Sequence, residues 1–204
     1  MLACCGAVQH QWEEHEVERR WLPRLLRCLI VGENPGDTNS DYFYEPPASY
    51  ASDSVVVRRA LLRCLHQRGL IPEPTLEGFQ DAGFLFDHAI RCQLASSAIK
   101  AERRKAMRYA WRLVENPAHL RERLAEARTV WVMGHFASNA VANASPDFPK
   151  KRRQISRPPY PARLRVCSKF FLSEYLSWRT EADAPRFCEA FESFAHEKAA
   201  FQDL

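Results

Sequence analysis

Short apolar runs of strand length recur along the chain, and longer segments with apolar residues at helical spacing separate them. The first run, CLIVG, is almost wholly apolar, which is typical of a strand buried on both faces of a sheet. By this pattern we predict four strands, at 28–32, 83–90, 129–134 and 162–171.

Helices are expected between these strands. A charged helical pattern covers 9–26 and breaks near Pro23, because proline removes a backbone donor. A second pattern begins at Ser52 or Asp53 as N-cap and stops at Gly69. The other helical patterns lie at 99–127, with an interruption at Asn116-Pro117, at 135–144 and at 183–200.

Regular alternation of strands and helices implies a parallel sheet with right-handed crossovers, because parallel neighbours need a covering connection. We therefore expect an α/β fold with three layers, α/β/α, around a mostly parallel four-stranded sheet. The 204 residues, 46% of them hydrophobic, can bury one core, so a single domain over 1–204 is the simplest division.

Composition narrows the class of protein. The net charge of +4 and pI near 8.7 are only mildly basic, so any nucleic-acid partner must be argued from local clusters of charge. The start of the chain has neither the basic region nor the long apolar run of a signal peptide. No apolar stretch approaches the roughly 20 residues of a membrane helix. A soluble, cytoplasmic protein is expected.

The seven cysteines are expected to be reduced thiols. Their number is odd and no secretion signal precedes them, which argues against a disulfide framework. No CxxC pair occurs in the sequence. Cys28, Cys64, Cys92 and Cys167 lie in apolar surroundings, where a thiol behaves as a small hydrophobic group.

Polar and flexible residues gather where the predicted strands end. GENPG at 32–36 follows the first strand, Phe86-Asp87-His88 lies at the end of the second, and Gly134-His135 follows the third. Because ligands of open α/β sheets bind at the carboxyl ends of the strands, these segments form a candidate active site. Taken alone, GENPG is equally typical of an ordinary turn, since Asn-Pro and Pro-Gly are turn dipeptides.

Over a longer stretch the chain resembles the uracil-DNA glycosylase superfamily. The segment 32–36 is similar to the Gly-Glu-Ala-Pro-Gly motif of the iron–sulfur branch, family 4, and to the Gly-Ile-Asn-Pro-Gly motif of the mismatch-specific branch. Residues 43–46 are similar to the Phe-Ala-His-Pro segment of the mismatch branch, and 85–92 to the family 4 strand Ile-Thr-Asn-Val-Val-Lys-Cys. With 130–142 similar to the later strand–Gly–helix segment, the likeness spans 29–171.

The resemblance implies a DNA repair enzyme, a monofunctional glycosylase that flips out uracil and hydrolyses its N-glycosidic bond. Glu33 is expected to act as base and to stabilise the oxocarbenium-like sugar, and Asn34 to position the attacking water. His88 stands where the family has its base-reading Asn, and an aromatic ring is expected to stack on the base. The expected base-binding residues are Gly32, Phe43, Tyr44 and His88.

Three family features are replaced here. The His-Pro-Ser motif after the last strand is absent, and the cysteines of the family 4 cluster are missing, so we expect no iron–sulfur cluster, no other metal and no cofactor. The segment 151–156, KRRQIS, is similar to the Lys-Arg-Arg-Arg-Ile-His loop of glycosylases that trap their abasic product, with Ser156 in place of the trapping His. The expected phosphate contacts are Lys151, Arg152, Arg153 and Arg157.

The expected partners are uracil-containing DNA, single- or double-stranded, and the abasic product, bound by a monomer. Two other readings stay open. The chain could be an abasic-site or damaged-DNA binding protein that kept the fold and lost catalysis, as the missing His-Pro-Ser suggests. GENPG could also cradle a phosphate in a nucleotide-binding or hydrolase domain, although there is no GxGxxG or Walker lysine and Pro35 removes a backbone donor.

Overall fold

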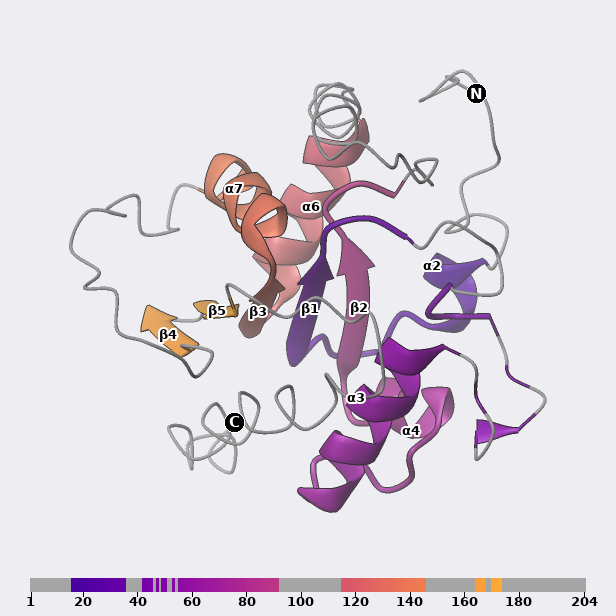
Figure 1. Ribbon diagram of the computed structural model, residues 1–204. Coiled ribbons are helices and arrows are strands. Elements are labelled where there is room, and N and C mark those ends of the chain that lie inside the picture. Colours follow the sequence, from indigo (N-terminus) through magenta and orange to yellow (C-terminus); the bar gives the residue numbers. More distant parts are fainter. Residues whose placement is uncertain are drawn as a thin grey trace, which may run out of the picture.

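The computed structural model describes residues 16–35, 42–45, 47, 49, 50, 53, 55–91, 115–145, 164–167 and 170–173. Within these residues the centre of the fold is a five-stranded sheet in the order β2-β1-β3-β5-β4 (Figure 1). Its strands are β1 (Cys28–Gly32), β2 (Phe84–His88), β3 (Thr129–Met133), β4 (Leu164–Cys167) and β5 (Phe170–Ser173).

The sheet is mostly parallel. β1 pairs in parallel with β2 on one side and with β3 on the other, and β3 pairs in parallel with β5. Every residue of β1, β2 and β3 is buried, as their continuous apolar runs predict. The expectation of an α/β fold with a mostly parallel sheet is confirmed.

The end of the sheet differs from the prediction. The sequence predicts one strand over 162–171, but the structure has two strands there, β4 and β5, which pair antiparallel. The register joins Cys167 to Phe170, so only the polar pair Ser168-Lys169 separates two mainly apolar strands of four residues each. A connection of two residues is long enough to join two antiparallel strands. The prediction of four strands is therefore wrong by one, because a hairpin was taken as one continuous strand.

Helices lie on both sides of this sheet (Figure 1). α4 contacts β2 from one side, and the Phe79 ring of α4 lies 5.3 Å from the Phe84 ring. α7 contacts β3 from the other side and packs on α6. The described helices are α2 (Val17–Arg20), α3 (Val56–Gln67), α4 (Leu76–Asp81), α6 (Glu115–Glu126) and α7 (His135–Ala144).

The helices differ from the prediction at two places. α3 begins at Val56 after an extended Val55, so neither Ser52 nor Asp53 is its N-cap, although it stops before Gly69 (φ +68) as predicted. Asn116-Pro117 lie in the first turn of α6, and the predicted helical pattern before Glu115 lies outside the described residues. The short helix α4, capped by the Thr75 side chain on Gly78 N, was not predicted. The predicted helix at 183–200 lies outside the described residues.

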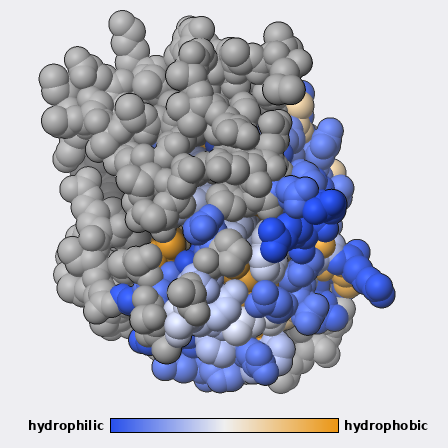
Figure 2. Space-filling view, turned by 90° about the vertical axis from the view of Figure 1, so that its right-hand side faces the viewer, coloured by the Kyte–Doolittle hydropathy of each residue, from blue (hydrophilic) through white to orange (hydrophobic). Residues whose placement is uncertain are grey.

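The core lies between the sheet and its helices, and the described surface is polar. Figure 2 shows mainly hydrophilic side chains on the described part of one face, with a few apolar ones between them. Cys28 and Cys64 are free thiols in the core, where burial raises the pKa of the Cys28 thiol, so it stays protonated. Among the described helices, none is both long and apolar enough to cross a bilayer.

Candidate functional site

The carboxyl ends of β2, β1 and β3 lie side by side, because these strands are parallel neighbours. Gly32 at the end of β1 is directly opposite His88 at the end of β2. Pairing continues past the strands, since Ala89 N donates to Gly32 O (2.9 Å) and Ile90 N to Glu33 O (3.1 Å). The sequence segments after the three strands thus meet at one edge of the sheet, as predicted.

Gly32 lies in a tight space at this edge. A Cβ atom at Gly32 would lie 3.2 Å from His88 Cδ2 and 3.2 Å from Phe86 Cζ. The rings of Phe86 and His88, which share one face of β2, therefore lean over the glycine. A side chain at position 32 would require these two rings to shift by a few tenths of an ångström.

Glu33 reaches across to the start of α7. Its Oε1 accepts a hydrogen bond from Phe136 N (3.0 Å) in the first turn of that helix. Carboxylates are favoured there, because the first backbone N–H groups of a helix lack internal partners. Gly134, with φ +91, makes room, since its Cβ would lie 2.8 Å from Glu33 Oε1. In the described part of the chain Oε2 of Glu33 accepts no hydrogen bond, so one carboxylate oxygen stays available.

Asn34 lies next to Glu33 and is half-buried. Its Nδ2 donates to the carbonyl oxygen of Pro35 at 2.7 Å, which folds the side chain back on its own turn. Glu33 and Asn34 are thus both at the edge of the sheet, and both take part in local structure.

His88 is 6% exposed and surrounded by aromatic rings. Its ring lies 5.1 Å from the Phe86 ring in an edge-on contact and 6.2 Å from the Tyr42 ring in a stacked one. Burial lowers the pKa of His88 to about 4, against the opposing charge of Asp87. The imidazole is therefore neutral at pH 7. Within the described residues neither ring nitrogen has a hydrogen-bond partner.

This depressed pKa predicts a loss of stability in acid. The unfolded chain binds a proton at His88 below about pH 6.5, whereas the folded chain does so only near pH 4. The free energy of unfolding should therefore fall by up to about 3 kcal/mol as the pH drops through this window. The carboxyl of Asp87 titrates below its ordinary range, so its contribution is lost only at lower pH.

Urea unfolding at several pH values measures this slope. His88→Gln should flatten it, because the variant has no imidazole at this position. An unchanged slope in His88→Gln would show that His88 is not the group that titrates.

The aromatic loop, residues 42–45, packs against the same face of β2. The Phe43 ring stacks on the Phe86 ring at 4.5 Å, and Tyr44 OH accepts a hydrogen bond from Phe86 N (2.8 Å). Both side chains are only 1% exposed. The structure thus places Phe43 and Tyr44 in the core behind the site, not on its surface. Tyr44 also satisfies a backbone donor on the outer edge of β2.

A buried ion pair holds the aromatic loop. Arg58 of α3 donates to Asp53 through Nε (2.5 Å) and Nη2 (2.6 Å), and both side chains are almost completely buried. Arg58 Nη1 donates to the carbonyl oxygens of Phe43 (2.9 Å) and Glu45. Sequence reasoning missed this pair. The signal is Arg58 on the apolar stripe of α3, three and four residues before Leu61 and Leu62.

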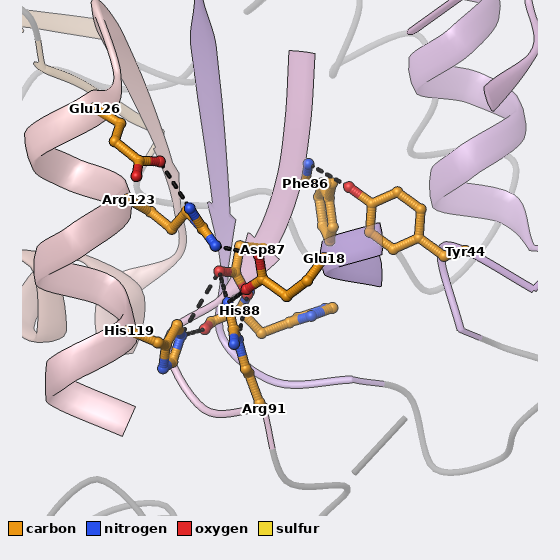
Figure 3. A network of polar contacts seen from close by, with 9 residues as sticks. All are labelled: Glu18, Tyr44, Phe86, Asp87, His88, Arg91, His119, Arg123 and Glu126. Atoms are coloured by element: carbon orange, nitrogen blue, oxygen red, sulfur yellow. Dashed lines mark hydrogen bonds and ion pairs between the residues drawn. The ribbon is translucent and has the colours of Figure 1, made fainter. Parts of the chain in front are cut away.

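Asp87 lies on the opposite face of β2, at the centre of a charged network (Figure 3). Its Oδ2 accepts from Arg91 Nη2 (2.9 Å) and lies 3.7 Å from His119 Nε2 of α6. Burial alone raises the pKa of Asp87, but the charges of Arg91 and His119 and the hydrogen bonds outweigh it and keep the pKa below its ordinary value. Sequence reasoning did not place His119 at the site.

The predicted phosphate contacts Lys151, Arg152, Arg153 and Arg157 lie outside the described residues. Among the residues that the structure does describe, no group of three or more His, Cys, Asp or Glu side chains could hold a metal ion. No protein-family model and no curated protein matches this chain.

Proposed function

We propose that this protein is a DNA glycosylase that excises uracil. The observation that carries the proposal is the placement of Glu33 and His88 at neighbouring strand ends, since Gly32, directly before Glu33, pairs with His88. Of the segments that resemble the uracil-DNA glycosylase superfamily, the described parts of 32–36, 85–92 and 130–142 come together at this edge. We assign the chain to the same three-layer α/β/α fold on this ground.

Cleavage of the N-glycosidic bond leaves positive charge on the sugar. The carboxylate of Glu33 is suited to stabilise this charge, because Phe136 N fixes one oxygen and leaves the other available. The same oxygen can take a proton from the attacking water, which the Asn34 amide helps to position. Anchoring by a helix terminus keeps the carboxylate in place, so little reorganisation is needed during the reaction.

The departing base carries the negative charge. The His88 imidazole is neutral at pH 7 and carries one N–H that can donate a hydrogen bond. A uracil oxygen that becomes anionic during cleavage is a suitable acceptor for this hydrogen bond. The His88 ring nitrogens have no competing partner among the described residues. We assign Phe43 and Tyr44, which are buried behind Phe86, to supporting this ring and not to stacking directly on the base.

One observation favours a second candidate, an abasic-site or damaged-DNA binding protein with reduced catalysis. Glu33 and Asn34 both make hydrogen bonds within the protein. If those bonds persist when DNA is bound, the pair stabilises the fold without acting on the sugar.

An assay on a DNA strand with a single uracil tests both candidates. Incubation with the protein followed by alkali should cut the strand at the uracil position, because an abasic site breaks in alkali. The binding protein would instead retain abasic DNA in a mobility-shift assay and leave the uracil strand whole. A strand that is neither cut nor bound would contradict both candidates.

A further inference from the structure

The charged network around Asp87 combines buried and exposed ionisable groups, and the proposed reaction leaves it unused. It joins the elements α2, β2 and α6 (Figure 3). Glu18 of α2 lies between Arg91 (3.4 Å) and Arg123, and Arg123 also donates to Glu126 (2.7 Å). The Asp87 carboxylate is fully buried and Arg123 nearly so, whereas Glu18 and Glu126 are exposed carboxylates that pair with the two guanidinium groups.

The network reaches the site through the main chain of His88. His119 Nε2 lies 3.1 Å from the carbonyl oxygen of His88, and His88 N donates to Asp87 Oδ1 at 2.7 Å. A carbonyl oxygen only accepts, so His119 Nε2 carries a proton and donates it. Both polar backbone groups of His88 are therefore held by side chains of the network.

The position of β2 explains why this contact matters. β2 is an edge strand of the described sheet, and its outward-facing backbone groups have no neighbouring strand. Tyr44 OH takes the Phe86 N–H, and two residues further along Asp87 and His119 take the two groups of His88. Without His119 the last residue of β2 would be held only on its N–H side.

We propose that His119 is a positioning residue, which fixes the main chain of His88 and thereby the place of the His88 imidazole at the strand end. Figure 3 shows the two imidazoles on opposite sides of β2, so His119 acts through the backbone and touches no substrate. The consequence for turnover rests on the proposed glycosylase function, whereas the placement of the ring does not.

Two variants with the same chemistry test the inference. His119→Gln and His119→Asn both replace the imidazole by a neutral amide, but only the longer Gln side chain reaches as far as Nε2. Because both lose the same charge, a difference between them reports the contact with the His88 carbonyl. Glu126→Gln is the matched control, since it changes a carboxylate of the same network that accepts from Arg123.

NMR titration of labelled histidine in the DNA-free protein measures the pH at which His88 is protonated. A general loss of stability does not change this pH as long as the protein is folded. In His119→Asn the His88 ring should gain exposure and titrate about one pH unit higher than in His119→Gln. On uracil-containing DNA, kcat of His119→Asn should be about tenfold lower than that of His119→Gln, with little change in KM. Glu126→Gln should match the wild type in both measurements.

Equal His88 titration in the two His119 variants would overturn the inference, even if the protein excises uracil. If the wild type releases no uracil but the titrations differ as expected, the glycosylase proposal fails and the positioning role stands. In the wild type the ¹⁵N shifts of His119 should report a proton on Nε2. A bare Nε2 would overturn the inference without any variant, should His119→Asn fail to fold.

Discussion

A variant that combines Glu33→Gln with Asn34→Ala should excise uracil at least about 100-fold more slowly than the wild type, with DNA binding largely retained. The variant lacks the carboxylate that stabilises the sugar cation and the amide that positions water. Neither substitution alters the proposed phosphate contacts, so affinity for DNA should remain. Single-turnover excision and a mobility-shift assay on the same DNA measure the two effects.

Gln at position 33 separates an effect on catalysis from an effect on stability, because it removes the charge but keeps the hydrogen-bond acceptor. The amide oxygen of Gln can still accept the hydrogen bond from Phe136 N, so the start of α7 keeps its partner. Glu33→Ala removes this acceptor and should cost about 1 kcal/mol of stability, as the loss of a helix cap does. Near-normal turnover in the double variant would place the catalytic groups elsewhere.

Loss of the Asp53–Arg58 pair should have the largest effect on stability. Asp53→Asn and Arg58→Met should each lower the free energy of unfolding by about 3–5 kcal/mol, because each leaves a buried partner without its counter-charge or donor. Arg58→Met also removes the donor to the carbonyls of Phe43 and Glu45. Denaturant unfolding measures both losses.

A double variant and a helix neighbour serve as controls. Asp53→Asn with Arg58→Met should be less destabilised than the sum of the single variants, since no buried charge is left alone. Arg63→Met, at an exposed position of α3, should change stability by no more than about 0.5 kcal/mol. If Asp53→Asn costs as little as Arg63→Met, the pair does not hold the aromatic loop.

The elements predicted well from sequence are those whose pattern is local. β1 and β3 are short apolar runs with clear ends, and α7 follows the helical spacing of its apolar residues. The hairpin of β4 and β5 was missed because a two-residue connection barely interrupts an apolar run. The capping role of Asp53 was wrong because its carboxylate binds Val55 N and Arg58 instead.

The sequence predicted at which edge of the sheet the site lies. It did not predict which residues of the site contact one another. Residues after parallel strands meet by topology, so Glu33, His88 and Gly134 could be placed together from sequence. The bond of Glu33 to Phe136 and that of His119 to His88 join residues far apart in the chain. Neither residue type nor spacing signals them. The burial of Phe43 was equally hidden, since an aromatic residue in a loop can face the core or a ligand.

Direct detection of the free base tests the central claim most directly. Purified wild-type protein is incubated with uracil-containing DNA, single- and double-stranded, and the released base is identified by mass spectrometry beside the Glu33→Gln and Asn34→Ala double variant. We expect free uracil from the wild type, one base per uracil site, and little from the variant. Absence of free uracil with the wild type on both kinds of DNA would contradict the account.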